Sequence, residues 1–138
     1  MRGLLADANV HGHQARIAKL LERSGLWDII VEIGLEFAVL SDIGLPGNVD
    51  DRTLWRRCQN EGWVLFTDNR NDEGETSLQA TLADSWAPGN LPILTLADKP
   101  RFERSAEYRE RVAQDIADVL FGLSGGEYRE RDRIYIPR

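Results

Sequence analysis

Short apolar runs alternate with segments of helical periodicity along this chain, and that alternation is the strongest constraint on its fold. Leu4 to Ala6 is a short apolar run, and Ile17, Leu20 and Leu21 then recur at helical spacing. Strands that alternate with helices favour a parallel sheet with helices on both faces. We therefore predict an α/β fold whose central, mostly parallel sheet has about four or five strands.

The expected elements begin and end where the periodicity changes or where glycine or proline interrupts it. Short apolar runs predict strands at residues 4–6, 27–33, 63–66, 92–96 and 134–136. Helices are expected up to residue 24, from about residue 51 to 61, over 75–86, and from 99 to about 122. Residues 34–48 are predicted to be a loop with one helical turn. The last run is either an edge strand or a tail that docks on another subunit.

Length and composition fit one ordinary domain over residues 1–138. The chain has 138 residues, of which 42% are hydrophobic, and that is enough for a core. No apolar run is long enough to span a bilayer and no signal-type segment is present, so we expect a cytoplasmic protein. The net charge of -6 argues against a protein that holds nucleic acid by bulk electrostatics.

Four carboxylates stand at positions that an α/β fold brings together. Asp7 follows the first expected strand, Asp68 and Asp72 follow the third, and Asp51 opens a helix. Because the carboxyl ends of parallel strands meet at one edge of the sheet, these side chains should converge. Carboxylates packed together repel each other unless a cation joins them. The arrangement therefore predicts a Mg²⁺ or Mn²⁺ site, since both ions favour oxygen ligands.

These residues also resemble a known family. The Asp7-Ala8-Asn9 end of the first strand, Asp51 and the run from Val64 to Asp72 are similar in order and interval to the PIN-domain nuclease superfamily. The closest likeness is to compact PIN-like proteins related to toxin–antitoxin ribonucleases, and it covers the first half of the chain. The resemblance implies a three-layer α/β/α sandwich and metal-dependent hydrolysis of RNA phosphodiester bonds.

The resemblance also implies roles for particular residues. It assigns catalysis and the binding of Mg²⁺ or Mn²⁺ to Asp7, Asp51, Asp68 and Asp72. It assigns supporting or substrate contacts to Asn9, Thr67, Asn69 and Arg70. The implied partners are single-stranded or structured RNA, an antitoxin protein and a second copy of the chain.

Two points about this set of acids stay open. Asp50 competes with Asp51, because helix phase alone does not separate neighbouring residues at a helix start. PIN nucleases generally carry another acid on a helix after the second strand, and here only Glu36 or Asp42 is available. Asp is also common at strand ends for local reasons, since it caps helices and closes turns.

Two alternative functions follow from the same residues. The first is a catalytically silent PIN-like module that keeps the fold in order to bind a partner. The second is an Asp-based phosphotransferase with Asp7 as the nucleophile. It ranks lower, because Asn9 stands where haloacid-dehalogenase-like enzymes carry a second Asp and no lysine is suitably placed after Asp68.

Overall fold

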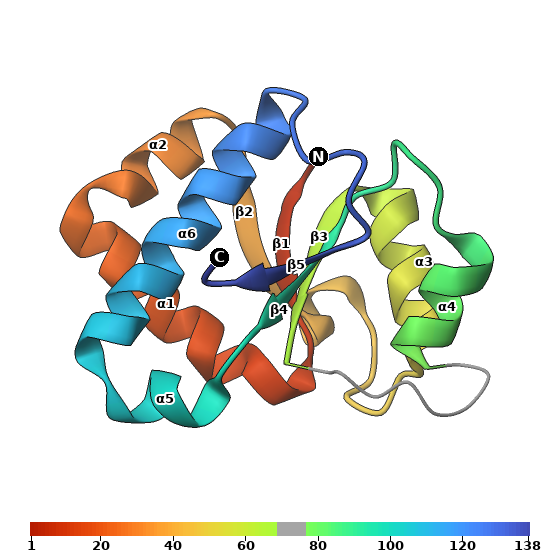
Figure 1. Ribbon diagram of the computed structural model, residues 1–138, viewed down its shortest axis with the longest axis horizontal. Coiled ribbons are helices and arrows are strands. Elements are labelled where there is room, and N and C mark those ends of the chain that lie inside the picture. The colour runs from red at the N-terminus through yellow and green to blue at the C-terminus, as the bar shows by residue number, and fades with distance from the viewer. Residues whose placement is uncertain (69–76) are drawn as a thin grey trace.

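A five-stranded parallel sheet forms the centre of the protein (Figure 1). The computed structural model describes residues 1–68 and 77–138. The strands are β1 (Gly3–Ala6), β2 (Glu36–Val39), β3 (Trp63–Thr67), β4 (Ile93–Leu96) and β5 (Arg133–Ile136). They lie in the order β2-β1-β3-β4-β5, and each neighbouring pair is parallel.

Helices cover both faces of this sheet (Figure 1). One face is covered by α1 (His11–Ser24), α2 (Leu26–Glu32), α5 (Lys99–Arg104) and α6 (Ala106–Ser124). The other face is covered by α3 (Asp51–Glu61) and α4 (Leu78–Ser85). Two short 3-10 helices, η1 (Ala8–Val10) and η2 (Leu40–Ile43), follow β1 and β2. The predicted α/β class with a three-layer α/β/α arrangement is therefore confirmed.

Alternating side chains of the strands divide the core into two layers. Leu4 and Phe66 belong to the cluster that packs against α1, α2, α5 and α6. Leu5 and Leu65 belong to the cluster that packs against α3 and α4. Because successive side chains of a strand point to opposite faces, a strand between two helical layers must be apolar at every position. This explains why β1 and β3 are continuous apolar runs, each buried along its whole length.

The predicted strand over residues 27–33 is wrong, because these residues form α2. The run is rich in β-branched residues, which favour a strand locally. In the structure Ile30 is buried, whereas Ile29 and Val31 are 44% and 57% exposed, so the run does not lie inside the sheet. Gly25 and Gly34, with φ of 81° and 85°, mark its two ends in the left-handed region that favours glycine.

Two further elements differ from the sequence prediction. Residues 34–48, predicted to be a loop with one turn, contain the edge strand β2 as well as η2. The long helix expected from residue 99 is divided at Ser105, which has an extended backbone with φ of -120°. The hydroxyl of Ser105 accepts a hydrogen bond from the Tyr108 amide at 3.1 Å and so caps a new helix.

No helix in the described ranges is long and apolar enough to cross a membrane.

Candidate functional site at the carboxyl edge of the sheet

The carboxyl ends of β1 and β3 meet where the strand order reverses. The chain runs from β1 outward to β2 on one side, and from β3 to β4 and β5 on the other. In open α/β sheets, such a switch point leaves a crevice at the carboxyl edge in which ligands bind. Asp7 follows β1 directly and Asp68 follows β3 directly, so the structure places both carboxylates at this position.

Asp7 is held by groups from both strands. Its backbone amide donates to the carbonyl oxygen of Phe66 at 3.0 Å. One carboxylate oxygen caps η1 by accepting from the Asn9 amide at 3.0 Å, and the other accepts from the Thr67 hydroxyl. These contacts fix the direction of the side chain at the edge. Asn9 and Thr67 therefore lie beside Asp7.

The pKa of Asp7 is raised above the ordinary aspartate value. Burial of the carboxyl group is the main cause, and the hydrogen bonds from Thr67 and Asn9 oppose it. The negative charges of Asp68 and Asp51 raise the pKa of Asp7 further. A carboxyl group in this setting keeps its proton to a higher pH than an exposed aspartate, and a perturbed pKa in a crevice is typical of functional groups.

Lys99 joins Asp68 at the same edge. Its ammonium nitrogen lies 3.3 Å from Asp68 Oδ2 and donates to the carbonyl oxygen of Asn9 at 3.0 Å. Lys99 opens α5, whose first turn is capped by Asp98 through the Arg101 amide at 3.0 Å. The sequence pattern did not predict this lysine as a site residue. Lys99 closely follows β4, but only the structure shows that β4 lies beside β3.

The structure separates the roles of Asp50 and Asp51. The carboxylate of Asp50 caps α3, accepting from the Thr53 amide at 2.9 Å and from the Thr53 hydroxyl at 2.8 Å. These hydrogen bonds lower the pKa of Asp50. Asp51 instead accepts from the Leu78 amide at 3.0 Å and acts electrostatically on Asp7. Asp51 is therefore the carboxylate that faces the edge.

The other predicted acids do not join this group among the described residues. Glu36 begins β2 at the opposite end of the sheet and pairs with Arg2 at 3.1 Å. Asp42 accepts from the Val39 amide at 2.9 Å and so closes the turn of η2. Asn69, Arg70 and Asp72 lie outside the described residues.

A preformed metal centre is not found within residues 1–68 and 77–138. No group of three or more His, Cys, Asp or Glu side chains is arranged there to hold a metal ion. The charges of Asp51 and Asp68 act on Asp7, but each of the three carboxylates is engaged by different groups. Because Asp72 lies outside the described residues, the set of four metal ligands stays a prediction.

An open hollow adjoins the edge. It has a volume of about 460 Å³ and is lined by Asp68, Leu96, Ala97, Asp98, Lys99 and Pro100. Its polar walls come from the carboxyl ends of β3 and β4 and from the start of α5. The hollow offers one ammonium group and exposed oxygen atoms to a small polar molecule.

Removing the charge of Asp7 should change the pH dependence of stability. Because the folded pKa lies above the ordinary value of 3.8, the folded state holds the proton more tightly than the unfolded state. Stability should therefore fall as the pH rises from 3.8 through the folded pKa, and stay lower above it. Asp7→Asn removes this ionisation, so its stability relative to wild type should increase over that interval.

Thermal unfolding of both proteins between about pH 3 and about pH 8 measures the difference. Asp28→Asn, on the exposed side of α2, is the control for the loss of one surface charge. An Asp7→Asn protein whose stability relative to wild type does not rise with pH would contradict the raised pKa.

Comparison with known proteins gives one informative match. The 3-isopropylmalate dehydratase small subunit of Beutenbergia cavernae is 30% identical over 99 residues, which is 72% of this chain and 46% of that protein. The chain thus spans about half the length of the curated relative that it matches. No family model matches the chain. No solved structure matches it either.

These findings contradict the PIN-domain resemblance. The matching protein is named as a dehydratase subunit, neither a nuclease nor a toxin, and no model of a nuclease family matches. The predicted endoribonuclease and toxin function is therefore wrong, and RNA and an antitoxin have no support as partners. The silent PIN-like module is excluded together with the PIN resemblance. The Asp-based phosphotransferase is also contradicted, because the matching protein is named as a dehydratase subunit. The physical reason is that strand-end carboxylates are common to many α/β sheets, whatever reaction they serve.

Proposed function

We propose that this chain belongs to a subunit of a metabolic enzyme and binds a small hydroxylated organic acid at the carboxyl edge of β1 and β3. The observation that carries the proposal is the half-buried Asp7, whose pKa is raised and whose position is fixed by Thr67 and Asn9. Asp7 is the group that would hold and move a proton. Lys99 would contact a carboxylate of the ligand.

The chemistry of a dehydratase supports these roles. Elimination of water removes a proton from one carbon and expels hydroxide from its neighbour, and the leaving oxygen needs a proton. A carboxyl group with a raised pKa keeps its proton to a higher pH and is therefore better suited to donate it. The relative is named for a dehydration reaction, and we propose the same type of reaction for the site of the present chain.

A protein partner is part of the same proposal. The relative is named as a small subunit, which implies that it assembles with another chain. The 99 matched residues make up 46% of that protein. We therefore propose that the edge described above is one wall of a site shared with a partner.

Mg²⁺ or Mn²⁺ at this edge stays a prediction. Once ionised, Asp7 would join Asp68 in supplying the hard oxygen ligands that such an ion prefers, so the ion and the proton of Asp7 would exclude each other. Further ligands would come from water or from the bound acid. A divalent ion would offset the repulsion between the site's carboxylates and an anionic ligand, and would polarise the oxygen atoms that it binds. A titration with and without the ion tests this point separately.

Calorimetric titration with 3-isopropylmalate tests the proposed function. We expect wild-type protein to bind this ligand and Lys99→Met to bind it about tenfold more weakly, because a charge-assisted contact is lost. Wild-type affinity should fall as the pH rises through the pKa of Asp7, since an ionised Asp7 repels the anion. In Asp7→Asn this pH dependence should disappear.

The control is Arg131→Met, which removes an exposed cation next to the amino end of β5, the end of the sheet opposite the proposed site. Adding Mn²⁺ should strengthen binding to wild type if the ion bridges protein and ligand. Absence of binding to wild type with or without Mn²⁺, or equal affinity in Lys99→Met, would overturn the proposal.

A further inference from the structure

A groove between α1 and α6 is separate from the carboxyl-edge site. It consists of two adjoining hollows of about 360 Å³ and about 310 Å³, which share Leu20, Arg23 and Glu110. Volumes of this size are typical of small-molecule sites. Because the hollows share these side chains, they form one continuous surface depression along the two helices.

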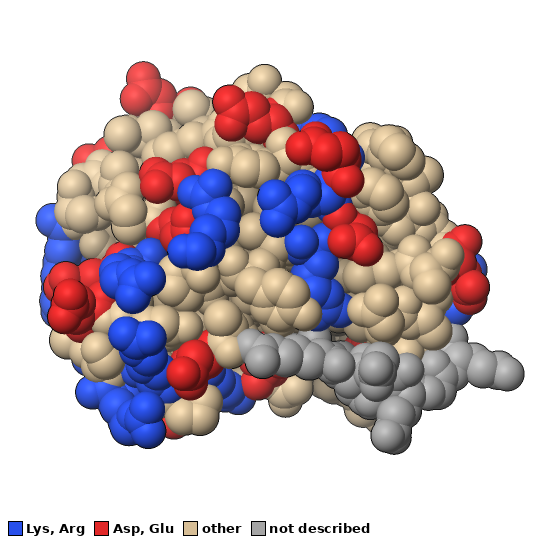
Figure 2. Space-filling model, viewed as in Figure 1, with Lys and Arg blue, Asp and Glu red and all other residues tan. Residues whose placement is uncertain are grey.

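One end of the groove is strongly basic. It is lined by Arg16, Lys19, Arg23 and Arg109, with Glu110 as the one acid among its lining residues. Within the described ranges, none of these four cations forms an ion pair. Basic side chains gather over this part of the molecule, where α1, α5 and the start of α6 lie (Figure 2). In a chain of net charge -6, this is a local concentration of positive charge.

Two of these cations are already held in position. The guanidinium of Arg109 donates to the carbonyl oxygens of Phe102 and Glu103, at 2.9 Å and 3.2 Å. The guanidinium carbon of Arg16 lies 5.6 Å from the centre of the Phe102 ring. A guanidinium that is ordered before binding loses less conformational freedom when an anion arrives.

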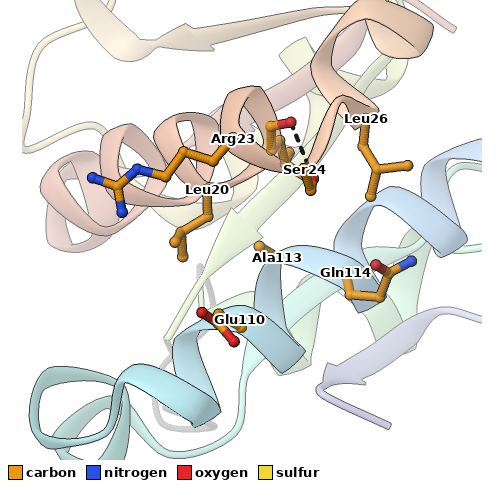
Figure 3. A pocket seen from close by; sticks show the side chains of 8 residues that line it. Leu20, Arg23, Ser24, Leu26, Glu110, Ala113 and Gln114 are labelled. Carbon is orange, nitrogen blue, oxygen red and sulfur yellow. Dashed lines mark hydrogen bonds between the residues drawn. The ribbon is translucent and has the colours of Figure 1, made fainter.

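The other end of the groove combines apolar side chains with Ser24, Gln114 and the shared Arg23 and Glu110. Leu21 and Ala113 are 1% and 3% exposed and form part of its floor, and the partly buried Leu20 and Leu26 complete the apolar lining. Figure 3 shows Leu20 and Leu26 directed into the space between the helices, while the Arg23 side chain extends away from Leu26. The apolar side chains therefore gather at this end, while three of the four cations line only the basic end.

We propose that this groove binds an anionic amphiphile, with its carboxylate or phosphate head at the basic end and its hydrocarbon chain along the apolar end. Arginine pairs with carboxylate and phosphate through parallel hydrogen bonds, which suits the head group. Burial of the chain against leucine side chains adds affinity with each methylene group removed from water. Neither a simple anion nor a neutral hydrocarbon would use both ends.

The test compares four probes in calorimetric titrations of the full chain. Octanoate and octyl phosphate carry an anionic head and a chain, acetate carries the head alone, and 1-octanol carries the chain with a neutral head. We expect one or both of the charged octyl compounds to bind at least tenfold more tightly than acetate and 1-octanol. The preferred head group identifies the carboxylate or the phosphate as the ligand's anion.

Two variants with the same substitution locate the site. Arg23→Gln removes a cation shared by both hollows, whereas Arg56→Gln removes an exposed arginine from α3 on the opposite face of the sheet. Arg23→Gln should weaken binding of the preferred probe about tenfold, and Arg56→Gln should leave it unchanged. Equal affinity for acetate or 1-octanol, no loss in Arg23→Gln, or no binding to wild type would overturn the proposal.

Discussion

Phe102→Ala is expected to lower the free energy of unfolding by about 3–5 kcal/mol, the usual cost of removing a buried aromatic side chain. Phe102 is fully buried in α5 and belongs to the larger core cluster. Its ring also lies 5.1 Å from the ring of His13, so it joins α5 to α1. Chemical denaturation followed by circular dichroism measures the change.

Phe102→Leu is the matched control for this cavity. Leucine fills most of the volume, so the loss should be below that of the alanine variant, at about 1.5 kcal/mol or less. Because α5 begins at Lys99, the alanine variant should also loosen the contact between Lys99 and Asp68. Equal stability of the alanine and leucine variants would show that Phe102 does not pack as described.

Gly3→Ala is expected to cost about 3 kcal/mol, because the new methyl group has no room between β1 and β2. An ideal Cβ at Gly3 would lie 1.8 Å from the carbonyl oxygen of Glu36, and the residue has φ of 156°. Gly3 and Glu36 are partners in the parallel register. Backbone atoms cannot move aside without separating the two strands. Urea denaturation of the variant measures the loss.

Gly12→Ala in α1 is the matched control for Gly3→Ala, and it should change the stability in the opposite direction. Gly12 lies in the first turn of α1, and a Cβ built there meets nothing within 4 Å. Alanine should therefore raise stability by about 0.5 kcal/mol, because it restricts the unfolded chain and favours the helix. A Gly3→Ala protein as stable as Gly12→Ala would contradict the close approach of β1 and β2.

The parts of the fold that sequence predicted best are those buried on both sides. β1 and β3 lie between two helical layers, so their sequences are continuous apolar runs that stand out from the surrounding pattern. The edge strand β2 gives a weaker signal, because only Ala38 among its four residues is buried. α2 was predicted as a strand, because its β-branched residues dominate the local preference while packing against the core decides the outcome.

The candidate site was predictable in part for a geometric reason. Asp7 and Asp68 follow parallel neighbouring strands, and that alone places them at one edge. Lys99 was missed because its role depends on β4 lying beside β3, which the order of the chain does not reveal. The choice between Asp50 and Asp51 likewise needed the structure, since the two differ in their partners, Thr53 and Leu78.

The nuclease interpretation failed for a reason that the same residues explain. Carboxylates at strand ends cap short helices and turns, as Asp7 caps η1, and they also recur in many sites with different chemistry. The order and spacing of these carboxylates in the sequence therefore located a candidate site but did not identify its reaction.

The most direct test of the proposed function is a map of where 3-isopropylmalate contacts the protein. Titration of isotopically labelled chain, followed by nuclear magnetic resonance of the backbone amides, distinguishes the carboxyl edge from the groove between α1 and α6. We predict saturable shifts at Asn9, Asp68 and Lys99 and none at Leu20 or Ala113. Shifts confined to the groove, or no saturable shift at the edge, would contradict the assignment of the site.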